Sequence, residues 1–310
     1  MPPIRALLYV ALVATGLGFT AFVSSIERAR NRLAGTRPPQ DGAATRARWP
    51  NLRELGIGFL TDFLDTLGIG SFAPTTALFR FAKVVPDRLI PGTMMVGHAL
   101  PTIAQSLIYI TVIEVDIVTL VLVVAASAVG AWLGAGTVAK LDRRGVQGGM
   151  GIALLLAAAI MFMGLRGYFP AGGALLGLSG GKLAIGLVGN FVLGALMTIG
   201  IGAYAPSLIM FGLLGMNVKS IFPIMMSSCA FIMPAGGPRF VRAGSYAPAA
   251  ALGLTLGGVP AVLIAAFVVR ELPLEVVRWL VLVVVIFTAV SMLRSARRPK
   301  SAEATPETPT

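Results

Sequence analysis

The chain carries the stretch LDTLGIGSFAP at residues 64–74, and a second stretch, LMTIGIGAYAP at residues 196–206, repeats it with a shift of 132 positions. Between residues 59 and 94 the same gapless shift gives eleven identities in 36 positions, with glycines and prolines among them. Shared apolar composition does not produce matches of this kind, so the chain contains an internal duplication.

The composition around these stretches is that of a membrane protein. Of 310 residues, 56% are hydrophobic and 12% are charged, about half the charge of a typical soluble domain. With roughly 20 residues for each span, the chain has room for about seven to nine transmembrane helices. The lipid bilayer is therefore the first expected partner, and a water-soluble domain is excluded.

The charged and metal-binding residues exclude several functions. The net charge is +12, but the basic residues lie between apolar runs and not on one surface with interleaved aromatics, so we expect no nucleic-acid partner. A single Cys and a single His exclude a disulfide framework and a Cys/His metal cluster. We expect no metal and no cofactor, which leaves transport, conduction or a metal-free membrane activity, and of these an enzyme is the least favoured.

The apolar segments of the sequence outline the membrane helices. They lie at about residues 6–25, 55–80, 89–111, 117–139, 148–166, 183–211, 220–234, 247–269 and 274–293. The segments 55–80 and 183–211 contain the duplicated stretches, and each is broken in the middle by glycines and a proline, which a continuous helix tolerates poorly.

The distribution of basic residues predicts how the broken segments cross the membrane. If each dips in and returns as a hairpin, the loops assigned inside carry 19 Lys/Arg and those outside carry 5; with full crossings the counts are 15 and 9. The positive-inside rule therefore favours hairpins, with the N-terminus outside and the C-terminus cytoplasmic. Seven arginines at residues 27–53 keep that loop inside, so the first helix is expected to be an uncleaved anchor.

The predicted fold is an all-α polytopic membrane protein of two inverted repeats. Each repeat consists of a re-entrant or broken helix plus three transmembrane helices, and one extra helix precedes them. The expected divisions are an anchor helix with a basic cytoplasmic loop (1–54), membrane repeat 1 (55–166), membrane repeat 2 (183–293) and a disordered cytoplasmic tail (294–310). Backbone that is not helical at mid-membrane must line a cavity or be buried in protein, so both breaks should face the interior.

The paired Gly-Ile-Gly elements, each followed by a small residue, an aromatic residue and Ala-Pro, resemble the TauE/SafE family of membrane permeases, over residues 55–293. The resemblance implies a permease of the bacterial inner (plasma) membrane that moves sulfite, sulfonates or related organosulfur anions, mostly as an exporter. Where the family has a run of three glycines, this chain has Gly70-Ser71-Phe72 and Gly202-Ala203-Tyr204. The substrate, the direction of transport and the oligomeric state are left open.

The duplicated breaks are candidates for binding a small anion. A proline just inside a half-helix, preceded by glycines, is typical of a helix N-terminus, where free N–H groups and the positive end of the dipole attract anions. The alternative is that Gly and Pro only allow kinks and close packing, as expected for Gly130 with Gly134 and for Gly253 with Gly257. The candidate substrate-binding residues are Gly68, Gly70, Ser71, Pro74, Thr75, Thr76, Gly200, Gly202, Ala203, Tyr204, Pro206 and Ser207.

Two carboxylates and the one histidine are candidates for proton coupling. Asp62 and Asp65 lie three apart within an apolar segment, where both are not readily ionised together, so at least one is expected to be protonated. A neutral carboxyl would also remove the repulsion between fixed negative charge and an anion bound nearby. His98 could pair with either Asp or reach the anion; a packed neutral histidine bonded to a carbonyl is the alternative. The acids could also form a structural pairing with His98, Lys83 or Arg80.

Three classes of function remain at this point. The first is a secondary transporter that rocks or gates two inverted units around a central anion site. The second is an anion channel, which would use the same helix ends without intramembrane acids. The third is a metal-free membrane-embedded enzyme, for which only Asp62, Asp65 and His98 could begin a catalytic cluster.

Overall fold

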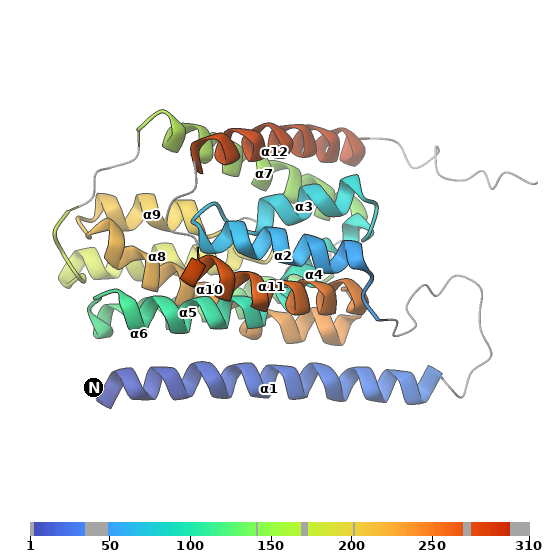
Figure 1. Cartoon of the computed structure of the whole chain (residues 1–310), viewed down its shortest axis with the longest axis horizontal. Coiled ribbons are helices and arrows are strands. Elements are labelled where there is room, and N and C mark those ends of the chain that lie inside the picture. Colours follow the sequence, from blue (N-terminus) through green and yellow to red (C-terminus); the bar gives the residue numbers. More distant parts are fainter. Residues whose placement is uncertain are drawn as a thin grey trace, which may run out of the picture.

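The computed structural model describes residues 3–34, 49–140, 142–168, 173–200, 202–268 and 274–297. Within these ranges the regular structure is helical, apart from one isolated bridge between Leu175 and Met216. The central part of the predicted basic loop and most of the predicted C-terminal tail lie outside the described residues. Most of the helices run along the long axis of the molecule and form a bundle (Figure 1).

The helices follow one another along the chain without any intervening sheet in the described part. They are α1 (Pro3–Ala34), α2 (Leu52–Thr66), α3 (Phe72–Phe81), the short 3-10 helix η1 (Asp87–Leu89), α4 (Ile90–Gly97), α5 (Ala99–Val112), α6 (Ile117–Val138), α7 (Arg143–Leu165), α8 (Gly180–Met197), α9 (Tyr204–Leu213), α10 (Val218–Ala243), α11 (Pro248–Val268) and α12 (Leu274–Arg297).

Seven helical stretches in the described residues are long and apolar enough to cross a bilayer. The chain is therefore an all-α multi-pass membrane protein, as its composition predicts. The segment expected at 220–234 is longer in the structure, because α10 continues to Ala243 through Pro234 and Pro238. Those prolines remove two N–H donors but do not end the helix.

Glycine conformations explain where the two long apolar segments break. α2 ends at Thr66 and α3 begins at Phe72, while α8 ends at Met197 and α9 begins at Tyr204. In the first break Gly68 and Gly70 have φ angles of 88° and 92°, and in the second Gly200 has a φ of 105°. Residues with a Cβ rarely adopt this left-handed region, so glycine is needed for the chain to leave the helix at these points.

In each broken segment the chain turns back on itself. After α9, Asn217 N donates to Leu175 O (2.8 Å), and Gly173 N donates to Met216 O (2.9 Å), so the end of α9 is bonded to the segment that precedes α8. At the other end of the bundle, α2 and α3 lie side by side (Figure 1). The start of α2 packs against the first turns of α11, and so does the start of α4, which follows α3. The two ends of the α2–α3 segment therefore lie at the same end of the bundle.

The shift of 132 residues found in the sequence also relates the helices. It carries α3 onto α9 residue for residue, and it brings the first residues of α6 and α7 within one position of the first residues of α11 and α12. It also relates Lys83 and Gly215, which both have positive φ just beyond the ends of α3 and α9. The duplication therefore extends well beyond the eleven identities of residues 59–94.

The first helix of each hairpin packs against a helix from the other half of the chain: α2 against α11, and α8 against α6. Glycines make both crossings close. A Cβ atom at Gly194 would lie 2.0 Å from Ser127 O, one at Gly130 would lie 1.9 Å from Phe191 O, and one at Gly257 would lie 2.1 Å from Leu55 O. Gly134 and Gly253 also abut the facing helix, so the prediction that these glycines allow close packing is confirmed.

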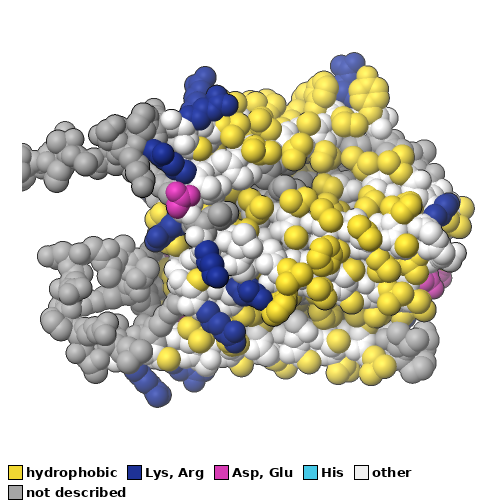
Figure 2. All heavy atoms as spheres, turned by 180° about the vertical axis from the view of Figure 1, so that it is seen from behind, with side chains coloured by type: hydrophobic (Ala, Val, Ile, Leu, Met, Phe, Trp, Pro, Cys, Tyr) yellow, Lys and Arg dark blue, Asp and Glu magenta, His cyan; other side chains and the backbone are white. Residues whose placement is uncertain are grey.

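Basic side chains gather mainly at one end of the molecule (Figure 2). This is the end at which α3 and α10 finish and α4 begins. The described Lys and Arg residues on the helix ends and loops that meet there include Arg80, Lys83, Arg88, Lys140, Arg144, Arg239 and Arg242.

Replacement of Gly130 or Gly194 by Ala should destabilise the fold. The added methyl group would have to push apart backbone atoms of α6 and α8, which costs about 1–3 kcal/mol for overpacking. We expect each variant to unfold several degrees below the wild type in detergent, followed by intrinsic fluorescence on heating. Gly148→Ala in α7 is the matched control, because nothing lies within 4 Å of its added Cβ; equal midpoints for all three variants would contradict the close crossing.

Candidate functional site

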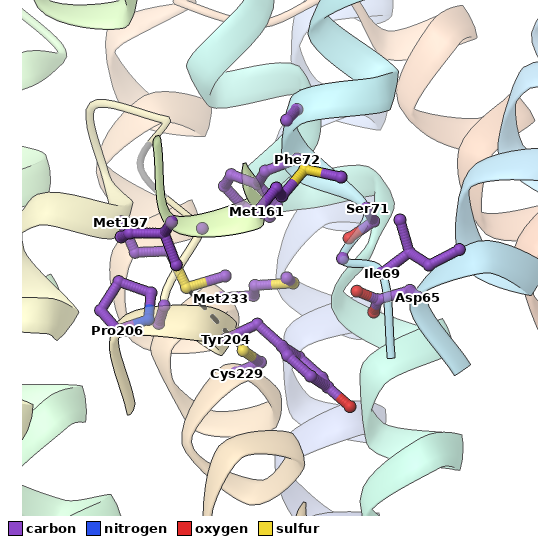
Figure 3. Close-up of a pocket in the computed structure, with 15 residues that line it drawn as sticks. Asp65, Ile69, Ser71, Phe72, Met161, Met197, Tyr204, Pro206, Cys229 and Met233 are labelled. Carbon is purple, nitrogen blue, oxygen red and sulfur yellow. Dashed lines mark hydrogen bonds between the residues drawn. The ribbon is translucent and has the colours of Figure 1, made fainter. Parts of the chain in front are cut away.

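A small cavity lies between the two breaks. Its volume is about 60 Å³, enough for about four to six waters or a solute of that size, given the roughly 10–15 Å³ that one water needs by this measure. Figure 3 shows Asp65 and Ser71 on one side and Met197 and Pro206 on the other. The lining residues are Asp65, Ile69, Gly70, Ser71, Phe72, Ala73, Ile160, Met161, Met197, Gly202, Ala203, Tyr204, Pro206, Cys229 and Met233.

The two breaks also approach each other through equivalent aromatic residues. Phe72 and Tyr204 occupy the same position of the duplicated stretch. The Tyr204 hydroxyl lies 3.3 Å from where a Cβ on Gly68 would be, and the Phe72 Cβ lies 3.9 Å from the corresponding point on Gly202. Each aromatic side chain therefore has an atom near a glycine of the opposite break.

Two helices begin at the wall of this cavity. α3 starts at Phe72 and α9 starts at Tyr204, and no side chain caps either helix by a hydrogen bond. The first N–H groups of an uncapped helix lack intrahelical acceptors and carry partial positive charge. On the α3 side, the Ser71 backbone N–H and the Gln105 amide both approach the Asp65 carboxyl. The cavity thus combines electropositive helix ends with one ionisable acid.

Behind the cavity, three fully buried side chains form a hydrogen-bonded relay. His98 Nδ1 lies 2.9 Å and 3.0 Å from the two oxygens of Asp62, and His98 Nε2 lies 3.0 Å from Thr75 Oγ1. All three side chains have no exposed surface. The relay connects α2, the α4/α5 junction and the first turns of α3, so it joins Asp62 to the helix that opens on the cavity.

The Thr75 hydroxyl links the protonation of His98 to the start of α3. Thr75 Oγ1 also lies 2.8 Å from Ser71 O, to which it can donate. A hydroxyl has a single proton, so it donates either to Ser71 O or to His98 Nε2. In the first case Nε2 must carry a proton in addition to the proton shared between Nδ1 and Asp62, so the Asp62–His98 pair holds two protons. In the second case Nε2 accepts, and the pair holds one proton.

The helix that carries His98 is interrupted locally. Pro101 has no N–H, so it cannot donate to Gly97 O as a residue of a regular helix would. The Thr255 hydroxyl of α11 takes this role, at 2.7 Å from Gly97 O. His98 therefore lies at a junction between α4 and α5 that α11 stabilises from the side.

The second half of the chain has no equivalent of the relay. The shift of 132 places Gly194 and Met197 at the positions of Asp62 and Asp65. Gly194 lies against the α6 backbone, and Met197 lines the cavity. The carboxylic acids and the histidine of the site thus come from the first half alone.

The predicted site residues divide into four groups. Gly70, Ser71, Gly202, Ala203, Tyr204 and Pro206 line the cavity together with Asp65. Gly68 and Gly200 shape the backbone of the breaks, and Asp62, His98 and Thr75 form the relay. Pro74, Thr76 and Ser207 are not among the lining residues.

Some hydroxyl groups and side chains differ from their predicted roles. Thr76 Oγ1 donates to Phe72 O at 2.9 Å, so it serves its own helix. His98 bonds a carboxylate and a hydroxyl and not a backbone carbonyl, so the alternative of a packed histidine on a carbonyl is wrong. Arg80 pairs with Asp87 at 3.1 Å and not with Asp62 or Asp65.

Sequence reasoning missed the apolar part of the cavity wall. Met161, Met197, Met233 and Cys229 line it. Cys229 is buried, with 8% exposure, and faces this space. Residues of these types occur throughout apolar helices, so no sequence signal separates those that face a cavity.

No family model, curated protein or solved structure matches this chain. The resemblance to the TauE/SafE family therefore stays a prediction from the residues of the duplicated stretches.

Because His98 is the single histidine of the chain, the ¹⁵N NMR signals of a histidine-labelled protein report on the relay alone. Thr75→Val removes the partner of Nε2 and should shift that signal, while Thr75→Ser should preserve it. Asp62→Asn should instead change the Nδ1 signal, because the amide replaces a charged acceptor. Spectra unaffected by Thr75→Val would contradict the contact between Thr75 and His98.

Proposed function

We propose that the chain is a secondary transporter of a small anion, which binds between the two breaks. The observation that carries the proposal is the cavity whose wall contains residues of both breaks and both helix N-termini. Backbone N–H groups at helix ends bind anions without a cationic side chain. The cavity volume of about 60 Å³ suits an anion of few atoms, and with the resemblance to the TauE/SafE family it favours sulfite or a short organosulfonate.

In this proposal the two halves of the chain are inverted repeats. The hairpin α2–α3 opens at the basic end of the bundle and the hairpin α8–α9 opens at the opposite end. α3 and α9 have 10 residues each, so each rises about 15 Å, half of a ~30 Å hydrocarbon core. The breaks would then meet near the membrane midplane, where transporters with broken helices bind their substrates.

The orientation follows from the basic end. Lys and Arg residues mark cytoplasmic loops, so the end that carries Lys83, Lys140 and Arg242 would face the cytoplasm of a bacterial cell. The N-terminus would then lie outside and the C-terminus inside. Export from the cytoplasm is the direction that the family resemblance favours.

Proton coupling would resolve the conflict between Asp65 and an anion in one cavity. An ionised Asp65 competes for the Ser71 N–H and repels the substrate, while a protonated Asp65 does neither. Asp62 and His98 lie behind it and can hold a proton that the Thr75 hydroxyl senses. A proton would thus enter the site with each anion, and its release would expel the anion.

Pro74→Leu and Pro206→Leu should each reduce anion flux into proteoliposomes to background. Each proline prevents its helix from extending back through the break, because the ring clashes with the carbonyl four residues earlier. With leucine, α3 or α9 can extend and fill the cavity. Flux of labelled sulfite and ethanesulfonate is the measurement, Pro86→Leu in the exposed loop before η1 is the control, and retained flux in both hairpin variants would refute the helix-end site.

Asp62→Asn combined with Asp65→Asn should abolish the dependence of flux on a pH gradient. The neutral amides keep the shape of the site but cannot take up or release the proton. Glu114→Gln, which removes an exposed carboxylate between α5 and α6, should leave coupling unchanged. Wild-type flux that ignores the pH gradient would point to an anion channel and would contradict the coupled mechanism.

A further inference from the structure

A second cavity lies at the basic end of the bundle, between the last turns of α6 and α10. Its volume is about 570 Å³, within the range of sites for small ligands. It shares no lining residue with the cavity between the breaks. The residues that line it are Trp132, Gly136, Ala139, Lys140, Ala235, Pro238, Arg239, Arg242 and Ala243.

Three cations in this wall have no anionic partner in the described part of the chain. No carboxylate forms an ion pair there with Lys140, Arg239 or Arg242. Two carboxylates near this end bond to other groups: Glu27 accepts from the Tyr246 hydroxyl, and Asp142 accepts from Gly145 N. The positive charge of the cavity is therefore left uncompensated by these residues.

Arg239 is held in place but is not fully hydrogen-bonded. Its guanidinium carbon lies 4.2 Å from the centre of the Trp132 ring, and Nη1 occupies the space that a Cβ on Gly136 would need, at 2.2 Å. Its Nε atom is buried and has no hydrogen-bond partner among the described residues. A buried N–H without an acceptor is unfavourable, so it indicates an acceptor that comes from outside the chain.

The apolar rim of the cavity identifies the kind of ligand. Trp132 and Leu133, on a helix that is apolar enough to span the bilayer, are 52% and 49% exposed. Trp side chains prefer the interface between headgroups and hydrocarbon. A ligand that reaches Arg239 across this surface would therefore need two parts. Its negatively charged group would contact the arginines, and its apolar chains would lie beside Trp132.

We propose that this cavity binds the phosphate headgroup of an anionic phospholipid. Arginine pairs well with phosphate oxygens, and basic pockets between transmembrane helices on the cytoplasmic side bind such headgroups. Arg239 would donate from Nε and the Nη atoms of its guanidinium group, while Arg242 and Lys140 add charge at the rim. The site lies outside the proposed transport cavity and is independent of the transported substrate.

The test uses Trp132 as its own reporter. In the full chain carrying Trp49→Phe and Trp279→Phe, placed in lipid nanodiscs, brominated phosphatidylglycerol should quench Trp132 more strongly than brominated phosphatidylcholine at the same mole fraction. Arg239→Gln with Arg242→Gln should weaken this preference roughly 30-fold, from the contribution of two cations near a phosphate. Lys83→Gln with Arg88→Gln removes two exposed cations of the same end away from the cavity and should leave the preference unchanged.

A replacement variant and a competition with free phosphate complete the test. If the Arg239 variant fails to fold, Arg242→Gln with Lys140→Gln replaces it, because both side chains are exposed and should not be needed for folding. Equal quenching by the two lipids, or equal loss of preference in the control pair, would overturn the proposal. Loss of the preference on adding millimolar inorganic phosphate would also overturn it, since the site would then be one for free phosphate.

Discussion

Hydrocarbon cannot hydrogen-bond to peptide groups, and this constraint governs the whole molecule. Two membrane helices are interrupted by Gly-Ile-Gly, so N–H and C=O groups are left without helical partners at each break. Residues of both breaks line a cavity within the bundle, where these groups can find partners other than lipid. The close crossings of α2 with α11 and of α8 with α6 depend on glycines such as Gly194 and Gly257. A larger side chain at these positions would hold the facing backbones apart.

The same constraint explains why the breaks border an open cavity that contains polar groups. Once a helix starts inside the protein, its first N–H groups need an acceptor, and the cavity between Phe72 and Tyr204 leaves space for one. Asp65 can serve on the α3 side, and no equivalent acid exists on the α9 side. A site that is built from duplicated backbone thus has its carboxylic acids and its histidine in only one of the two copies.

Much of this could be predicted from the sequence, because the decisive features depend on backbone chemistry. The glycines with positive φ, the prolines in the first turn of each half-helix and the shift of 132 residues are all visible in the chain. The pairing of Asp62 with His98 was one of several options, since 36 residues separate them and helix packing alone brings them together. The methionines of the cavity wall could not be predicted, because nothing in an apolar helix marks the side that faces a small space.

The first helix of each hairpin packs against a helix of the other half, and this affects how the protein folds during its synthesis. The first hairpin is synthesised long before α11, the helix that it packs against, leaves the ribosome. Until α11 is made, the first hairpin lacks its final packing partner. The insertion machinery or the helices already synthesised must then keep its unpaired peptide groups away from lipid. Each half therefore lacks the packing partner of its hairpin until the other half is present.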